Sequence, residues 1–321
     1  MLDVETGGDV RADMQASGRL LLKIAGVLLL ALALSGVPLL IAHRAPAAPT
    51  VTVSKGGLSI DAYRGLATWV SIYERRAWAD PEAAVSGMAA HGARTLFIET
   101  GNSGSREAVF EPLRMAEFIR AAHAHGMKVV AWYLPKMSNM ALDYDRIAQA
   151  ISFKTGDGQG FDSFALDIES TAIRKVSRRN AALATLSAKI RTLVGPSYAL
   201  GAIIPSPVGI AKQTGFWNGF PYGYVASAYD VVVPMGYYTY HGKGAAAAAA
   251  DVGGSLRILR QQPGCADVPV HLIGGLAGKT TPAEVGAFAR AARASGCIGA
   301  SLYSWSATSE GEWNALRAVG R

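Results

Sequence analysis

Short β-branched and aromatic stretches alternate with helix-like stretches along the chain after residue 60, and this alternation restricts the possible folds more than any other feature. Such alternation predicts repeated βα units that build a parallel sheet. The predicted strands are 65–73, 94–100, 127–135, 161–169, 198–205, 229–238, 268–276 and 298–305. The predicted helices are 80–91, 112–125, 143–153, 171–194, 207–213, 245–262, 282–295 and 309–319. Eight units in about 260 residues match a (β/α)8 TIM barrel, so the predicted fold class is α/β.

An open, doubly wound sheet would show the same alternation. It is disfavoured because no G-x-G-x-x-G phosphate loop follows the first predicted strand. Three glycines follow the predicted helices and lead directly into strands, as expected of the left-handed residue that ends a helix: Gly92, Gly126 and Gly296. The histidines before two of them, His91 and His125, are interpreted as helix C-terminal residues rather than metal ligands.

Residues 24–42 carry no charged side chain, and at 1.5 Å per residue their helical length is close to the roughly 30 Å of a bilayer core. Arg11, Arg19 and Lys23 precede this segment, so the positive-inside rule predicts a cytoplasmic N-terminus and an extracytoplasmic remainder. The predicted organisation is a tail over 1–19, a transmembrane signal anchor over 20–43, a linker over 44–60 and the barrel over 61–321. The alternative is a cleaved signal peptide, which would leave a secreted protein.

The chain has two cysteines, Cys265 and Cys297, and each precedes one of the last two predicted strands. Neighbouring strands would place both cysteines at the same end of adjacent elements, and an extracytoplasmic location permits oxidation. We therefore expect a disulfide between them. The alternative is a pair of small buried apolar residues.

The net charge of +7 accompanies a charged fraction of only 17%, and the basic residues are spread along the chain. This distribution argues against a nucleic-acid partner. No spacing of His, Cys and carboxylate residues typical of a metal site is present, so no metal or other cofactor is predicted.

Carboxylates and aromatic residues dominate the predicted C-terminal strand ends, where barrel enzymes hold their active sites. Asp167 and Glu169 are two residues apart, so both side chains should leave the strand on the side of the barrel mouth. Two carboxyl groups this close raise the pKa of one of them, which provides the proton donor that glycoside cleavage needs. The alternative is a structural role, for instance an ion pair with Arg174. Aromatic faces for sugar rings are predicted at Trp132, Tyr133, Tyr237, Tyr238 and Trp305.

Three stretches of the chain resemble glycoside hydrolase family 18, the chitinase-like barrels. Residues 161–169 resemble the strand-four signature D-G-x-D-x-D-x-E, residues 233–237 resemble the strand-six M-x-Y, and residues 299–305 resemble strand eight. The resemblance implies that Glu169 is the acid/base, that Asp167 orients an N-acetyl group of the substrate, and that Tyr237 steadies the intermediate. It also adds Asp162 and Tyr303 to the predicted substrate-binding residues.

The chain departs from that pattern at four places: Ala165 replaces the middle aspartate of the signature, Ser163 replaces its glycine, Tyr238 stands where the family has Asp or Asn, and Trp305 lies two residues later than the family's tryptophan. Without an N-acetyl group on the substrate, a second carboxylate must act as nucleophile or base. Glu99, at the end of the second predicted strand, is the best placed, because the seventh predicted strand holds no glutamate. Glu99 could equally pair with an arginine.

Two smaller features are less specific. Asn102 and Ser103 follow the second predicted strand as candidate sugar hydrogen-bonding residues. The aromatic-rich stretch 216–224, in a predicted loop before the sixth strand, either walls a groove or packs against the body of the domain.

These features predict a membrane-anchored glycoside hydrolase that acts on a cell-envelope or environmental glycan, which could contain N-acetylhexosamine. The alternative is a catalytically inactive barrel that binds polysaccharide or a partner protein at the cell surface. An aldolase or isomerase acting on a phosphorylated metabolite is disfavoured, because no lysine stands at a predicted strand end.

Overall fold

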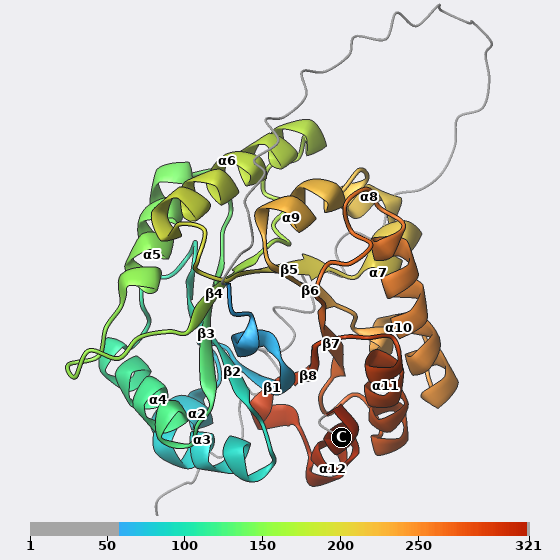
Figure 1. Cartoon of the computed structure of the whole chain (residues 1–321), viewed down its shortest axis with the longest axis horizontal. Helices are drawn as coiled ribbons and strands as arrows, with labels where there is room; N and C mark the ends of the chain where they lie inside the picture. The colour runs from blue at the N-terminus through green and yellow to red at the C-terminus, as the bar shows by residue number, and fades with distance from the viewer. Residues whose placement is uncertain (1–57, 320–321) are drawn as a thin grey trace, which may run out of the picture. The chain divides into compact units, whose positions relative to one another are not determined.

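The computed structural model describes residues 58–319 and shows a closed barrel of eight parallel strands in chain order (Figure 1). The strands are β1 (Gly65–Val70), β2 (Thr95–Asn102), β3 (Lys128–Leu134), β4 (Ser163–Asp167), β5 (Leu200–Pro205), β6 (Val231–Met235), β7 (His271–Leu276) and β8 (Gly299–Tyr303). All eight lie within or close to the predicted ranges. The closed order confirms the barrel over the open-sheet alternative.

Helices surround the strands as an outer ring (Figure 1). The longer ones are α3 (Pro81–Ala90), α4 (Pro112–Ala124), α5 (Met140–Ser152), α6 (Val176–Val194), α10 (Ala245–Arg260) and α11 (Pro282–Ala294). Shorter ones are α2 (Arg75–Ala79), α7 (Pro207–Lys212), α8 (Thr214–Trp217), α9 (Tyr222–Ala228) and α12 (Glu310–Leu316). The 3-10 turns are η1 (Asp61–Tyr63), η2 (Tyr238–Tyr240), η3 (Trp305–Ala307) and η4 (Arg317–Val319). Gly92, Gly126 and Gly296 have positive φ values of 86°, 69° and 75°, as predicted for residues that end helices.

The stretch before β6 is helical rather than the loop that the sequence predicts, because α8 and α9 form there. Its aromatic residues pack inward. Trp217 is fully buried, its ring lies beneath the Arg179 guanidinium at 4.5 Å, and Phe220 and Tyr222 are also buried. Of the two interpretations of this segment, the structure supports packing.

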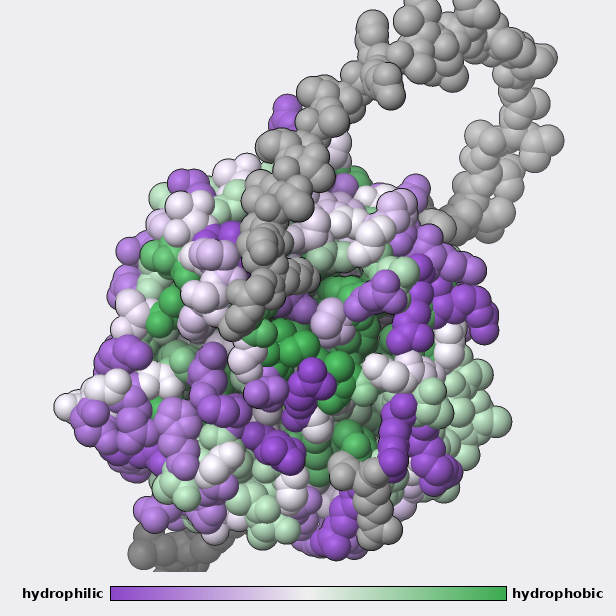
Figure 2. Space-filling model, in the orientation of Figure 1, coloured by the Kyte–Doolittle hydropathy of each residue, from purple (hydrophilic) through white to green (hydrophobic). Residues whose placement is uncertain are grey.

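Alternation along the strands separates two cores. Side chains on one face of each strand pack against the helices, whereas those on the other face fill the barrel interior. The interior cluster includes Trp69, Phe97, Trp132, Val233 and Ile273. In the orientation of Figure 1, the space-filling view shows apolar surface gathered near the centre of the ring and hydrophilic surface over much of the surrounding helices (Figure 2).

The N-terminal end of the barrel is closed by η1, the blue segment at the centre of the ring in Figure 1. The Tyr63 hydroxyl shares a hydrogen bond with Ser163 Oγ at 2.7 Å and donates to the Phe164 carbonyl at 2.9 Å. Gly201 leaves space for this ring, since a Cβ there would lie 2.7 Å from it. Tyr63 therefore plugs the barrel at the end opposite to the predicted site.

His271 connects this plug to the next layer of the interior. Its Nδ1 lies 2.8 Å from the Tyr63 carbonyl oxygen, which can only accept, so Nδ1 carries the proton. Burial lowers the pKa of His271 to about 4, so the ring is neutral and its Nε2 accepts from Ser301 Oγ at 3.0 Å. Ser301 Oγ in turn accepts from Trp69 Nε1 at 2.8 Å. The orientation of Trp69 is thus fixed from the bottom of the barrel.

Replacing Gly299 by alanine is expected to lower the free energy of unfolding by about 1–3 kcal/mol. A Cβ there would lie 2.5 Å from the Tyr63 carbonyl oxygen and 2.7 Å from that of Gly65, and it would also collide with His271. The control is Gly253→Ala on α10, where a Cβ meets nothing within 4 Å and should stabilise the helix slightly. Urea unfolding of both variants measures the difference. Equal stabilities would contradict the close packing described above.

Both cysteines are free thiols, which corrects the predicted disulfide. They precede neighbouring strands as expected, but their environments differ. Cys265 is buried, its Sγ lies 3.7 Å from the Pro263 carbonyl oxygen, and it interacts with Tyr222 of α9. Cys297 instead interacts with Arg260 of α10. Adjacent positions in the topology therefore do not bring the sulfurs together.

The predicted tail, anchor and most of the linker lie outside the described residues. Between residues 58 and 319, the structure contains no helix with the length and apolar character needed to cross a bilayer.

Candidate functional site

Asp167 and Glu169 lie at the C-terminal end of β4, as the sequence predicts. The Ile168 amide continues the ladder by donating to the Ile203 carbonyl of β5 at 2.8 Å, and the Ile168 side chain is buried in the outer core. Alternation then directs the two flanking carboxylates toward the interior side. Asp167 is buried, with 6% of its surface exposed, and Glu169 is partly buried.

The two carboxylates are electrostatically coupled. Burial and the nearby Glu169 and Glu99 carboxylates raise the pKa of Asp167 well above its usual value. Burial also raises the pKa of Glu169. The Asp167 Oδ1 atom has no hydrogen-bond partner among the described residues, and the charged groups that shift the pKa of this aspartate are carboxylates. The alternative of an ion pair with Arg174 is therefore not seen.

Glu99 extends from β2 into the same region and is 2% exposed. Its Oε2 accepts from the Ile72 amide at 3.1 Å, and its Oε1 accepts from Asn102 Nδ2 at 3.2 Å. Burial raises the pKa of Glu99 to about 7, against the lowering effect of these two donors, and Glu169 adds to the rise. Glu99 has no arginine partner in these contacts. A third carboxylate therefore joins the pair on β4.

Tyr237 follows β6 and packs against the interior cluster. Its backbone lies in the left-handed region with φ 44°, a conformation that is costly for a residue with a side chain. Its amide donates to the Gly274 carbonyl of β7 at 2.8 Å, which holds this geometry. Burial raises the pKa of Tyr237, and Tyr303, Glu169 and Asp167 add to the rise. The phenol therefore stays protonated beside the carboxylates.

Aromatic rings form the interior next to the carboxylates. Trp69 stacks on Phe97 with ring centroids 4.2 Å apart, meets Trp132 edge-on at 6.1 Å and lies 6.4 Å from Tyr303. Trp132 Nε1 is buried without a hydrogen-bond partner among the described residues. Trp132 and Tyr303 were predicted from the sequence, whereas Trp69 was not. Strand alternation could have identified Trp69, because it lies two residues after Ala67 on β1 and both side chains belong to the interior cluster.

Tyr133 and Tyr238 do not reach this site, which corrects two of the predicted substrate contacts. The Tyr133 hydroxyl donates to Asp143 Oδ1 of α5 at 2.9 Å. The Tyr238 hydroxyl shares a hydrogen bond with Thr280 Oγ1 at 2.6 Å, and its ring lies 5.9 Å from that of Phe288. Tyr133 follows Trp132 within β3, where strand geometry turns consecutive side chains to opposite faces. Tyr238 lies beyond β6, where it begins η2 after the left-handed Tyr237 and packs toward α11.

Trp305 and Asp162 are also placed elsewhere. Trp305 lies in η3, beyond the end of β8, and its ring is 5.6 Å from that of Trp313 on α12. Asp162 precedes β4 at the opposite end of the barrel, where it accepts from Lys128 Nζ at 2.8 Å and meets His123 Nε2 at 2.9 Å. Both predictions are corrected: Trp305 packs on the outer helices, and Asp162 ties together chain segments at the N-terminal ends of the strands.

Glu74, which the sequence analysis left without a role, ties two loops together at the mouth. It follows β1, and its Oε2 accepts from the Ser306 amide of η3 at 3.0 Å. Burial raises the pKa of Glu74, and hydrogen bonds from Ser304 and Ser306 oppose the rise. This contact joins the loops after β1 and β8, which are neighbours in the closed barrel.

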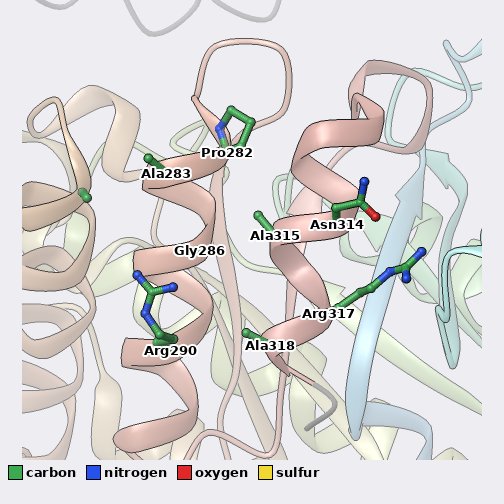
Figure 3. A pocket seen from close by; sticks show the side chains of 9 residues that line it. Pro282, Ala283, Gly286, Arg290, Asn314, Ala315, Arg317 and Ala318 are labelled. Atoms are coloured by element: carbon green, nitrogen blue, oxygen red, sulfur yellow. The ribbon is translucent and has the colours of Figure 1, made fainter.

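A hollow of about 430 Å³ lies between α11 and α12 (Figure 3). Its lining residues are small or basic: Ala245, Pro282, Ala283, Gly286, Arg290, Asn314, Ala315, Arg317 and Ala318. It contains none of the carboxylates described above. Across residues 58–319, no group of three or more His, Cys, Asp or Glu side chains has a geometry suited to a metal ion.

Comparisons with known proteins give no matching family model and no matching curated protein. Solved structures do match. A family 18 chitinase from Cycas revoluta, solved with allosamidin, is 11% identical with a TM-score of 0.57, and the match covers 79% of this chain and 98% of that one. The spore cortex-lytic enzyme of Bacillus cereus is 11% identical at 0.58, over 79% and 74%. The endo-β-1,4-mannanase of Thermotoga petrophila is 12% identical at 0.58, over 75% and 68%. The neighbours are family 18 chitinases and related glycoside hydrolases, and this chain shares their barrel fold.

Proposed function

We propose that this chain is a glycoside hydrolase, anchored in a membrane by residues 20–43, which cleaves a glycan of the cell envelope or the environment outside the cytoplasm. The observation that carries the proposal is the convergence of Asp167, Glu169 and Glu99 from β4 and β2 at the aromatic-lined C-terminal end of the barrel. Carboxyl groups that exchange protons beside flat apolar faces are what glycosidic cleavage requires.

Glu169 is the proposed proton donor to the leaving oxygen. Burial raises its pKa, so the group keeps its proton to a higher pH than an exposed glutamate does, and it is the more accessible of the two acids at the end of β4. Asp167 is more deeply buried, and its Oδ1 has no hydrogen-bond partner among the described residues. Tyr237 keeps its phenolic proton and can donate a hydrogen bond to substrate or intermediate.

Tyr303 is only partly buried and offers a ring to a sugar, while the buried Trp69 and Trp132 rings pack beneath it as an apolar floor. The solved neighbours are named as chitinases, a mannanase and a cortex-lytic enzyme, which favours a polysaccharide or oligosaccharide substrate here. The location outside the cytoplasm rests on the apolar segment 24–42 and the basic residues that precede it.

The test uses the full-length protein in detergent, offered N-acetylchitohexaose, peptidoglycan, cellohexaose and mannohexaose, with new reducing ends as the readout. We expect release from at least one glycan near neutral pH. The absence of release from every glycan would refute the hydrolase.

The second candidate is an inactive barrel that binds polysaccharide or a partner protein. Ala165 favours it, because the interior face of β4 then lacks a carboxylate below Asp167. In that case the protein would sediment together with an insoluble glycan and release no reducing ends. The Glu169→Gln variant would bind the glycan equally well.

A further inference from the structure

Three carboxyl groups share the C-terminal end of the barrel, and they do not have equivalent surroundings. Glu99, Asp167 and Glu169 each act on at least one of the others. Carboxylates held so close do not all ionise near neutral pH, so the cluster retains protons. The negative charge that remains settles where hydrogen-bond donors stabilise it.

Donors surround only Glu99. The Ile72 amide donates to its Oε2 at 3.1 Å, and Asn102 Nδ2 donates to its Oε1 at 3.2 Å. The Asn102 amide cannot be reversed, because its Oδ1 accepts from the Gly104 amide at 2.8 Å. Two N–H groups are therefore fixed toward the two Glu99 oxygens.

The acids on β4 lack such donors. Asp167 Oδ1 is buried and unpaired, and no hydrogen bond to Glu169 is formed by any residue in the described part of the chain. Hydrogen bonds to an ionised carboxylate favour ionisation, whereas burial without them favours the protonated acid. The donors therefore favour the anion at Glu99 over the anion at Asp167, and the pKa of Glu99 of about 7 leaves Glu99 ionised on the alkaline side of neutral pH.

The register of the sheet places Glu99 level with Ala165, the residue that stands where the family 18 signature has its middle aspartate. Glu99 pairs with Trp132, and Trp132 pairs with Ala165, so the three residues form one rung across β2, β3 and β4. Ala165 brings no charge to that rung. Glu99 is its only carboxylate in these three strands.

From this geometry we infer that Glu99 is the nucleophile of the site and reacts in its ionised form, and that the substrates are glycans whose cleaved unit carries no 2-acetamido group. The inference rests on the proposed hydrolase. Glu169 gives its proton to the glycosidic oxygen while a Glu99 oxygen bonds to the anomeric carbon and the bond to the leaving sugar breaks. Water then attacks that carbon, its proton passes to Glu169, and the ester to Glu99 breaks.

The first experiment compares the full-length wild type with Glu99→Gln on N-acetylchitohexaose, cellohexaose and mannohexaose. The wild type should cleave a hexose oligomer that lacks acetamido groups. Glu99→Gln should lose about a thousandfold or more in kcat on that oligomer with a comparable melting temperature. Cleavage of N-acetylchitohexaose alone, or a Glu99→Gln rate within about threefold of wild type, would overturn the inference and leave the hydrolase standing.

The second experiment separates a nucleophile from a merely structural carboxylate. Sodium azide should restore turnover to Glu99→Ala and yield a glycosyl azide, because the small anion occupies the vacated position. Loss of activity without azide rescue would overturn the nucleophilic role. If the wild type cleaved none of the glycans, the proposed hydrolase function itself would be refuted. That outcome is distinct from a failure of the nucleophile assignment.

Asn102→Ala tests the inference without removing the carboxylate. The loss of one donor should shift the acid limb of the kcat/KM profile to higher pH, because the Asn102 hydrogen bond lowers the pKa of Glu99. The other titratable groups that act on Glu99 are Asp167, Glu169 and Tyr303, and all remain in this variant. Asn314→Ala, an exposed asparagine on α12, is the matched control and should leave the profile unchanged. An unshifted acid limb in Asn102→Ala would overturn the assignment of the charge to Glu99.

Discussion

Replacing Glu169 by glutamine is expected to lower kcat/KM for the cleaved glycan by about 10²–10⁴-fold, the usual contribution of a general acid. Glutamine keeps the size of the side chain but cannot give a proton to the leaving oxygen. The loss should be smaller on substrates with an acidic phenol as leaving group, because such a group departs with little protonation. Initial rates on a glycan and on an aryl glycoside measure both effects.

The matched control for this variant is Glu82→Gln, which makes the same chemical change at an exposed position on α3. It should keep wild-type kinetics and melting temperature. Activity of Glu169→Gln equal to that of Glu82→Gln would refute the assignment of the proton donor.

The second large effect concerns stability in acid. The fully buried His271 has a pKa of about 4, against about 6.5 for histidine in an unfolded chain. The unfolded state therefore binds a proton between these pH values while the folded state does not. The contribution of His271 to the free energy of unfolding is complete above pH 6.5. It is lost as the pH falls toward 4, and the total loss is about 3 kcal/mol.

The measurement is urea unfolding of wild type and His271→Gln between pH 4 and 7. Glutamine retains a donor and an acceptor but does not titrate, so the stability difference between wild type and variant should shrink as the pH falls. Glu99, Asp167 and Glu169 have raised pKa values, and their effect on stability has the opposite sign because the folded state holds their protons up to a higher pH than the unfolded state does. Those groups remain in both proteins and cancel in the difference. A difference that stays constant with pH would contradict the neutral, buried imidazole.

The strands and the longer helices could be predicted from local patterns. β-branched runs, the glycines that end α3, α4 and α11, and the spacing of the units all act over a few residues, so single-sequence reasoning identifies them. The short helices α8 and α9 were missed, because their aromatic residues form helix through contacts with distant elements such as α6 rather than through helical periodicity.

The site could be predicted where strand alternation decides the answer. The spacing of Asp167 and Glu169 places them on one side, and Glu99 follows from the same argument on β2. Adjacent aromatic residues were the difficulty, since 132–133 and 237–238 each hold one interior residue and one that packs outward. At 132–133 the strand phase is set by packing against α5, and at 237–238 the left-handed turn and packing against α11 decide.

The sequence by itself determined the eight βα units, the interior-facing pair of acids on the fourth strand and the apolar segment that predicts an anchor, because each depends on residues close together in the chain. Only the tertiary structure decided which carboxylate has N–H donors, which tryptophan stands beside the acids, and that Cys265 and Cys297 stay apart. Those outcomes depend on contacts between residues far apart in sequence, such as Glu99 with Ile72 or Trp69 with Ser301, and no local pattern encodes them.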